Sequence, residues 1–156
     1  MLKPILLVED NPHDLELTLI ALSKSQLANE VVVVRDGAEA LDYLNRRGEF
    51  ADRPVGSPAV ILLDLKLPKV DGLEVLEEVR DSAELRSIPV VMLTSSREEP
   101  DLKRAYELGV NAYVVKPVAF HDFVTAIADL GVFWAVLNEP PPGSLRLERR
   151  SGRPTD

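Results

Sequence analysis

Four sites in this chain place charged or hydroxyl side chains, of the types that can bind metal ions or phosphoryl groups, directly after a short apolar run. They are Glu9 and Asp10 after PILLV, Asp64 after AVILL, Thr94 after PVVML, and Lys116 after AYVV. In a parallel α/β sheet the ligand crevice lies outside the carboxyl ends of the strands, so these residues are expected to converge. Three carboxylates in a partly buried crevice need positive charge, because burial and mutual repulsion disfavour their ionised forms. Lys116 supplies one charge, and a hard divalent metal ion would supply the rest.

Asp64 is the candidate nucleophile of this site. A carboxylate attacks a phosphoryl group when other groups neutralise the charge on the equatorial oxygens of the transition state. Mg²⁺ suits that task, since it prefers oxygen ligands and usually takes one or two carboxylates together with waters and phosphate oxygens. We expect Asp10 and Asp64 to be direct ligands and Glu9 to be a direct or water-mediated ligand. The backbone carbonyl of Lys66 is a further candidate.

Thr94 and Lys116 are the candidate phosphoryl-binding side chains. Lys116 would pair with one phosphoryl oxygen, and Thr94 would donate a hydrogen bond to another. A cis peptide bond between Lys116 and Pro117 would turn the chain sharply and direct the ammonium into the crevice. Taken singly, Asp10 and Thr94 also suit helix caps, and Lys116 with Pro117 suits an ordinary turn. The occurrence of all of them at strand ends favours a phosphoacceptor assisted by a metal ion.

The apolar runs are predicted to be five buried β-strands that alternate with amphipathic helices. Continuous apolarity indicates strands buried on both faces, and Leu, Val or Ala at three- and four-residue spacing indicates helices. The predicted strands cover residues 4–8, 31–34, 59–63, 89–93 and 112–115, and the predicted helices cover residues 14–25, 37–46, 72–80, 98–108 and 120–137. This alternation predicts an α/β protein with a doubly wound, five-stranded parallel sheet of order 2-1-3-4-5.

Composition bounds the class of protein. A length of 156 residues suits one domain with a real core and leaves no room for a second catalytic or DNA-binding domain. The net charge of −8, with Lys and Arg scattered, argues against nucleic-acid binding. The absence of cysteine excludes thiolate sites, and His13 and His121 are too few for a histidine-based site. Without a signal peptide or an apolar stretch of about 18 residues, we expect a cytoplasmic protein that does not bind membranes.

Two segments interrupt the alternation of strands and helices. Residues 45–58 (NRRGEFADRPVGSP) are predicted to be a long polar loop. Beyond the last helix, a run of prolines excludes helix, so we expect a domain over residues 1–138 and an extended or disordered tail over residues 139–156.

At its polar strand ends the chain resembles the receiver domain of two-component response regulators, over about residues 2–137. The matching segments are VEDN at 8–11, LLDLKLPKVDG at 62–72, MLTSS at 92–96 and GVNAYVVKP at 109–117. The resemblance implies a flavodoxin-like receiver fold in which Asp64 accepts a phosphoryl group from a sensor histidine kinase or a histidine phosphotransfer protein, with Mg²⁺ required. It implies a switch and not an enzyme. In this switch Thr94 and Tyr113 move on phosphorylation and re-form the surface of the fourth helix, fifth strand and fifth helix.

A narrower resemblance is to the single-domain regulators associated with bacterial and cyanobacterial phytochromes. It rests on the loop RRGEF, the motif LxLPKxDG and the last predicted helix, which ends in FWAVLNEPPP. It implies a phytochrome kinase as the partner and a homodimer formed through the last strand and helix. Phe133 and Trp134 are candidate interface residues, because aromatic residues are enriched in interface cores; the alternative is that they pack within the protomer.

Lys66 is expected to alter the rate of autodephosphorylation, since it puts a flexible cation two residues after Asp64. Either it shields the phosphoryl group from water, or it pairs with Glu98 or Glu99 at the start of the fourth predicted helix.

Other functional classes fit the sequence less well. A flavin- or nucleotide-binding enzyme needs a glycine-rich phosphate loop after the first strand, where this chain has EDNPHD. A phosphatase of the haloacid dehalogenase type needs a second acid two residues after its nucleophile, where this chain has Lys66. An adaptor or dimer scaffold that works without phosphorylation stays open, although loss of Asp64, Thr94 or Lys116 would be its expected mark.

Overall fold

The computed structural model describes residues 3–24 and 29–129, and within them five strands alternate with five α-helices. The strands are β1 (Ile5–Val8), β2 (Val31–Val34), β3 (Val60–Asp64), β4 (Val90–Thr94) and β5 (Ala112–Val115). The helices are α1 (Pro12–Lys24), α2 (Gly37–Asn45), α3 (Gly72–Asp81), α4 (Pro100–Glu107) and α5 (Phe120–Asp129). The predicted boundaries are reproduced to within two residues wherever the chain is described. Two differences matter for the site, since β3 includes Asp64 and β4 includes Thr94 as their last residues.

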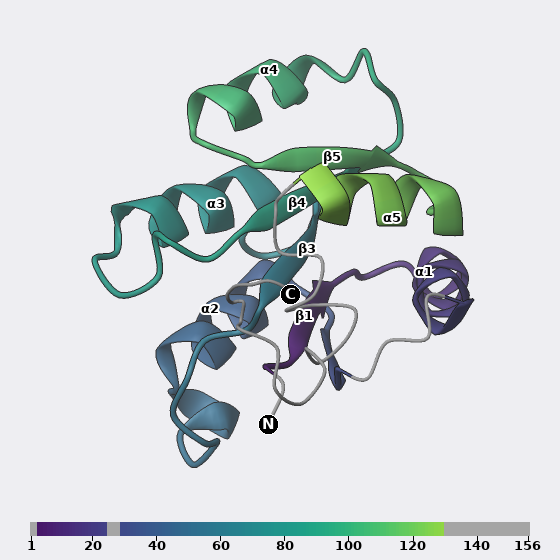
Figure 1. Ribbon diagram of the computed structural model, residues 1–156. Helices are drawn as coiled ribbons and strands as arrows, with labels where there is room; N and C mark the ends of the chain where they lie inside the picture. Colours follow the sequence, from purple (N-terminus) through teal and green to yellow (C-terminus); the bar gives the residue numbers. More distant parts are fainter. Residues whose placement is uncertain (1–2, 25–28, 130–156) are drawn as a thin grey trace, which may run out of the picture.

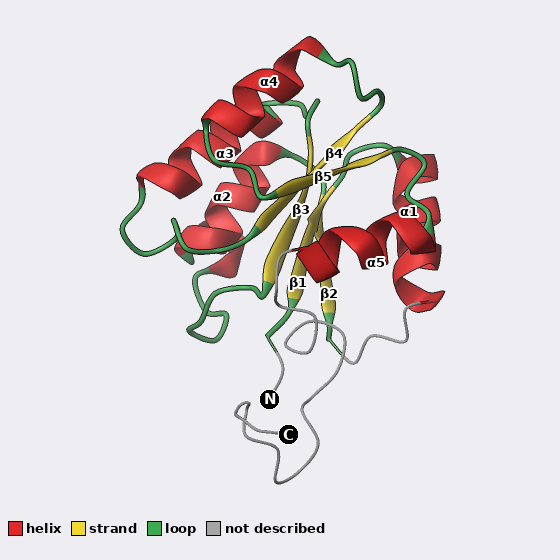
Figure 2. Cartoon of the chain, turned by 45° about the horizontal axis from the view of Figure 1, so that its top comes forward, coloured by secondary structure: helices red, strands yellow, loops and turns green. Residues whose placement is uncertain are grey.

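The strands form one parallel sheet in the predicted order β2-β1-β3-β4-β5. Helices α1 and α5 cover one face of the sheet, and α2, α3 and α4 cover the other (Figures 1 and 2). This is the doubly wound, flavodoxin-like arrangement expected from the alternation of strands and helices.

Burial on both faces explains why the strands are continuously apolar. Alternate residues of a strand point to opposite faces of the sheet. In β1, Leu6 and Val8 pack in the cluster under α2, α3 and α4, whereas Ile5 and Leu7 pack in the cluster under α1 and α5. All four side chains are fully buried. A polar residue inside such a strand would lose its hydration, so polar chemistry is confined to the strand ends.

Side chains that accept backbone hydrogen bonds fix the starts of the helices nearest the site. Asn11 accepts a hydrogen bond from the backbone N–H of Asp14 at 3.0 Å, directly before α1. Asp71 and Glu74 form a reciprocal capping box at the start of α3. Asn11 is therefore the residue that caps α1. Asp10 does not serve as the helix cap, which was the alternative role for it.

The predicted loop over residues 45–58 contains a short 3₁₀-helix, Gly48–Phe50, and is held together by Arg53. The Arg53 guanidinium donates to the backbone carbonyls of Tyr43, Pro54 and Gly56 at 2.6–2.9 Å and lies 4.2 Å from the centre of the Tyr43 ring. These contacts tie the end of α2 to the backbone of the loop that follows it. The polar composition of the loop therefore reflects a fixed turn structure.

Several sequence-based predictions concern residues beyond the described part of the chain. The C-terminal end of the last predicted helix, Phe133, Trp134 and the tail over residues 139–156 all lie outside it. Among the helices of residues 3–24 and 29–129, none has both the length and the apolar character needed to cross a membrane.

Candidate functional site

The parallel register places the polar strand ends at one level of the sheet. Val8 pairs with Leu63, so Glu9 and Asp64 follow side by side at the ends of β1 and β3. Thr94, the last residue of β4, pairs with Val115, and the backbone N–H of Lys116 donates to the Thr94 carbonyl at 2.7 Å. The sheet thus brings together residues that are far apart in the sequence, as predicted.

Glu9, Asp10 and Asp64 form a carboxylate cluster that suits a cation. Each contributes an oxygen, and these three oxygens lie within 4.8 Å of one another. Glu9 and Asp64 are buried, with 0% and 4% of their surface exposed, whereas Asp10 is exposed. A hard divalent cation prefers this type of oxygen donor, and Asp10 leaves the cluster open to solvent.

Lys116 lies against this cluster and makes three ion pairs. Its Nζ is 3.3 Å from Glu9 Oε1, 3.0 Å from Asp14 Oδ2 and 3.2 Å from Asp64 Oδ2. An ammonium has three N–H donors, so these contacts use its full capacity. The Lys116–Pro117 peptide bond is cis, as expected. The three ion pairs place the ammonium in the crevice that the sequence predicts for it.

Burial and charge set the protonation of the cluster. Burial, followed by the neighbouring Asp64 carboxylate, raises the pKa of Glu9 to about 7, although the Asn11 N–H and Lys116 oppose this rise. Burial lowers the pKa of Lys116, but the hydrogen bond to Asp14 and the charges of Asp64 and Glu9 outweigh it, so the net pKa is raised. Lys116 is therefore a permanent cation, and Glu9 takes up a proton more readily than an exposed glutamate does.

Thr94 is 1% exposed and hydrogen-bonds locally. Its hydroxyl donates to the Ser96 carbonyl at 3.0 Å and accepts from the Ser96 N–H at 3.3 Å. It does not cap α4, where Glu99 is the N-cap residue and makes no side-chain cap. The hydroxyl is therefore engaged by the β4–α4 loop in this structure, and a turn of the side chain would be needed to reach a group on Asp64.

The loop after β3 carries Lys66 and passes close to Asp64. The Lys66 N–H donates to Asp64 Oδ1 at 3.3 Å, while its Nζ lies 2.6 Å from Asp101 Oδ2 and 3.6 Å from Glu99 Oε1. Of the two predicted roles, pairing at the start of α4 is the one this structure contains, but the nearer partner is Asp101. Neither Glu98 nor a shielding contact with Asp64 accounts for the position of the ammonium. The Lys66 carbonyl as a metal ligand stays a prediction.

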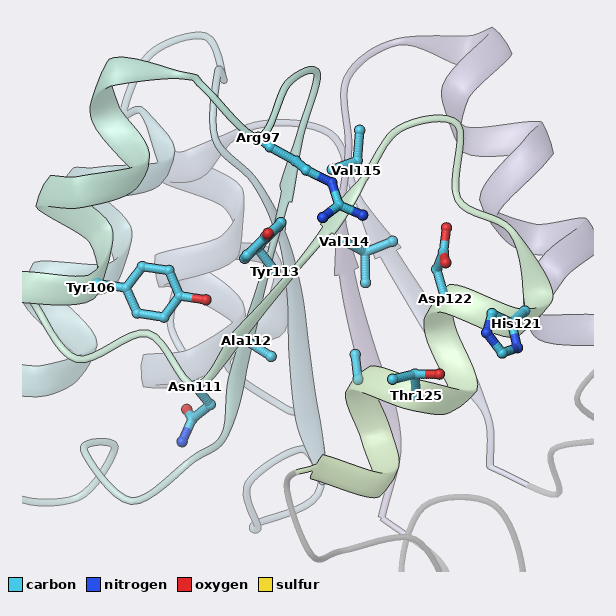
Figure 3. A pocket seen from close by; sticks show the side chains of 11 residues that line it. Arg97, Tyr106, Asn111, Ala112, Tyr113, Val114, Val115, His121, Asp122 and Thr125 are labelled. Carbon is cyan, nitrogen blue, oxygen red and sulfur yellow. The ribbon is translucent and has the colours of Figure 1, made fainter.

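Tyr113 lies on β5 at the edge of a cavity of about 310 Å³ between the α4 and α5 sides of the molecule (Figure 3). Its ring is half-buried and meets the exposed Tyr106 ring edge to face, with centroids 6.2 Å apart. Arg97, from the loop after β4, lines the same cavity. The ring therefore borders open space next to the β4–α4 loop that holds Thr94, which gives it room to change position.

Asp14 is the site residue that the sequence reasoning missed. It lies in the first turn of α1 and contacts Lys116, which is 102 residues away in the sequence. The available signal was an acidic residue one turn beyond the two acids at the end of β1. That signal is weak, because acidic residues are common in the first turn of any helix.

Comparison with known proteins gives the family. Residues 5–128 match the model of the response regulator receiver domain, so the chain belongs to this family. The structure of the bacteriophytochrome response regulator RtBRR is 75% identical and superposes with a TM-score of 0.83, covering 96% of this chain and 90% of that one. These findings confirm the predicted family and fold.

Two cyanobacterial relatives bear on the site. Response regulator Rcp1 of Synechocystis sp. is 42% identical over 132 residues, which is 85% of this chain and 88% of Rcp1. The crystal structure of its Mn²⁺-bound form has a TM-score of 0.70 at 40% identity and covers 88% of this chain and 96% of that one. The phosphorylated cyanobacterial phytochrome response regulator RcpA is 43% identical with a TM-score of 0.71, covering 86% of this chain and 94% of RcpA. The narrower resemblance to phytochrome-associated regulators is confirmed as well.

Proposed function

We propose that this chain is a phosphorylation-dependent response regulator in which Asp64 accepts a phosphoryl group from a phosphohistidine of a sensor kinase or phosphotransfer protein. The observation that carries this proposal is the carboxylate cluster of Glu9, Asp10 and Asp64 with the Lys116 ammonium against it. A buried carboxylate that is paired with a lysine and open to solvent on one side is suited to attack phosphorus. The phosphorylated structure of the relative RcpA supports the same role for this chain.

The transfer follows from the chemistry of these groups. An oxygen of Asp64 forms a bond to phosphorus, the P–N bond of the phosphohistidine breaks, and its electron pair returns to the imidazole nitrogen. Lys116 balances the negative charge that the phosphoryl oxygens bring into the crevice. Thr94, once released from Ser96, donates a hydrogen bond to a phosphoryl oxygen. Tyr113 then changes position in the adjoining cavity, which alters the surface of α4, β5 and α5.

We infer that Mg²⁺ is the cofactor, held by Glu9, Asp10, Asp64 and the Lys66 carbonyl. The donor set fits, since one oxygen of each of the three carboxylates lies within reach of a single ion. When bound, the ion neutralises phosphoryl oxygens in the transition state. The Mn²⁺-bound form of Rcp1 supports a divalent cation here.

The proposed partner is a phytochrome histidine kinase, and the output is a contact with another protein. The similarity to RtBRR, a bacteriophytochrome response regulator, and to RcpA, a cyanobacterial phytochrome response regulator, supports this pathway. We propose that the chain acts in the cytoplasm as a homodimer whose interface includes Phe133 and Trp134. It binds neither nucleic acid nor membranes, and it catalyses only its own phosphorylation and dephosphorylation.

Intact mass after incubation with Mg²⁺ and phosphoramidate tests the phosphoacceptor. We expect one labile phosphoryl adduct on the wild type and on Asp81→Asn, an exposed control at the end of α3, and none on Asp64→Asn. No adduct on the wild type, under conditions that phosphorylate another receiver, would favour the phosphorylation-independent scaffold. An adduct on Asp64→Asn would place the acceptor elsewhere. Omitting Mg²⁺ should abolish the reaction.

Two further measurements test the partners. Phosphotransfer from a phytochrome kinase should be faster than transfer from an unrelated histidine kinase, and the opposite order would reject the phytochrome pathway. Sedimentation of wild type and Trp134→Ala, each with and without phosphorylation, tests the dimer. A wild-type monomer in both states would reject it.

A further inference from the structure

Asp14 is the one carboxylate on Lys116 that lies outside the candidate metal-ligand set. Its Oδ2 is 3.0 Å from the lysine Nζ, the shortest of the three ion pairs. Its side chain is 27% exposed, compared with 0% for Glu9 and 5% for Asp64. Within the described residues, the cluster of oxygens suited to a cation contains Glu9, Asp10 and Asp64 but not Asp14. Asp14 therefore contacts the ammonium from the solvent side, with a carboxylate that is not part of the candidate metal-ligand set.

Cation binding and phosphorylation of Asp64 would affect the three ion pairs of Lys116 differently. Oxygens of Glu9 and Asp64 are needed by a cation, and Asp64 is also the phosphoacceptor. A lysine that turns to a phosphoryl oxygen gives up those two contacts and keeps Asp14 as its carboxylate partner. The backbone of Asp14 is held in place, because its N–H donates a hydrogen bond to Asn11 Oδ1 at the start of α1.

We propose that Asp14 is a positioning residue for phosphoryl transfer, whose carboxylate holds the Lys116 ammonium at the mouth of the crevice where it meets the phosphoryl group. This inference rests on the proposed function, since it takes Asp64 as the phosphoacceptor. Without Asp14, the lysine keeps Glu9 and Asp64 as partners and is drawn toward the buried carboxylates. There it competes with the cation and meets the phosphoryl group less often, so phosphorylation slows.

The competing explanation is that Asp14 only stabilises α1 as an acidic residue near the positive end of the helix dipole. Three variants separate the two explanations. Asp14→Asn removes the charge, Asp14→Glu keeps it on a longer side chain, and Glu16→Gln removes one charge from an exposed position of the same helix. Within the described chain, Glu16 makes no ion pair with Lys116, so it controls for the loss of one negative charge from α1, while the Asp14→Glu variant and the Lys116→Met background control for the helix dipole.

The rate of adduct formation is measured by intact mass with Mg²⁺ and phosphoramidate. We expect Asp14→Asn to react about tenfold more slowly, the loss typical of one charge-assisted hydrogen bond. Asp14→Glu should recover part of that loss, and Glu16→Gln should react within about twofold of the wild type. Urea unfolding without metal or phosphoryl donor gives a second readout. In this measurement, Asp14→Asn should lower the urea midpoint when Lys116 is present. In a Lys116→Met background, the same substitution should lower the midpoint much less.

The outcomes separate failure of this inference from failure of the proposed function. If the wild type forms the adduct and Asp14→Asn reacts equally fast, Asp14 does not position the lysine, while Asp64 remains the acceptor. If Asp14→Asn is slow, Asp14→Glu recovers nothing and the urea midpoints show no dependence on Lys116, Asp14 acts only through α1 and the inference is wrong. If the wild type forms no adduct, the proposed function fails first, and the positioning role fails with it.

Discussion

The protonation of Glu9 makes the stability of the metal-free protein depend on pH in a direction opposite to that of an ordinary acidic residue. Its pKa of about 7, compared with 4.5 for an exposed Glu, means that the folded protein keeps a proton that the unfolded chain releases between these values. The free energy of unfolding therefore falls as pH rises through this interval and levels off above about pH 7. The free energy of unfolding falls by about 1.4 kcal/mol for each pH unit, so the loss between pH 4.5 and about pH 7 is at most about 3 kcal/mol.

Urea unfolding from about pH 5 to about pH 8, in the presence of a chelator, measures this effect. Glu9→Gln replaces the carboxyl with a neutral amide of the same shape, so it should lose the decline and be the more stable protein above pH 7. Titrating groups that do not contact Glu9 are common to the two proteins and cancel in the comparison. Saturating Mg²⁺ should also flatten the wild-type curve, because a metal ion keeps Glu9 ionised in the folded state.

Wild-type and Glu9→Gln curves that ran parallel across this range would refute a raised pKa of Glu9 in the folded protein. A constant difference would mean that Glu9 has the same proton affinity in the folded and unfolded states. The decline could also disappear in Glu9→Gln but persist in the wild type with saturating Mg²⁺. That result would support the raised pKa of Glu9 and show that Glu9 is not a metal ligand.

Three other substitutions probe the surroundings of Asp64. In Gly72→Ala the new Cβ would lie 2.3 Å from the Asp64 carbonyl oxygen, so we expect a loss of about 1–3 kcal/mol in urea unfolding together with slower phosphorylation; an unperturbed protein would show that the loop after β3 yields easily. Asp71→Ala removes the capping box of α3 and should cost about 1 kcal/mol while the phosphorylation rate stays unchanged, which makes it a control for stability alone. Lys66→Ala breaks an exposed ion pair with Asp101 and should change stability by less than about 1 kcal/mol. The same variant should alter the lifetime of phosphorylated Asp64, and an unchanged lifetime would contradict a role for Lys66 in dephosphorylation.

The convergence of the site could be predicted because it depends on features that a sequence carries directly. Apolar runs of four or five residues define strands, and their alternation with helices defines a parallel sheet in which all carboxyl ends lie at one edge. A polar residue directly after such a run must then lie at that edge. Asp64 and Lys116 are 52 residues apart in sequence and 3.2 Å apart in the structure for this reason alone.

The partners of the charged side chains could not be predicted in the same way. Lys116 pairs with Asp14 and Lys66 pairs with Asp101 because of how α1 and α4 are rotated and seated on the sheet. That seating depends on packing across the whole core, and several acids at either helix start fit the local pattern equally well. Local spacing also says nothing of the rotamer that turns the Thr94 hydroxyl toward Ser96.

The sequence by itself determined the fold, the family and the level of the sheet at which the acids, the hydroxyl and the lysine meet. The apolar runs and their alternation with helices are sufficient to place these residues. A polar residue directly after a strand of a parallel sheet lies at the carboxyl edge, whatever its neighbours there are. Only the tertiary structure decided which carboxylates hold Lys116, how far burial raises the pKa of Glu9 and where the Lys66 ammonium lies. Those depend on burial and on distances of a few ångströms between helices and loops, which are set when the whole chain packs.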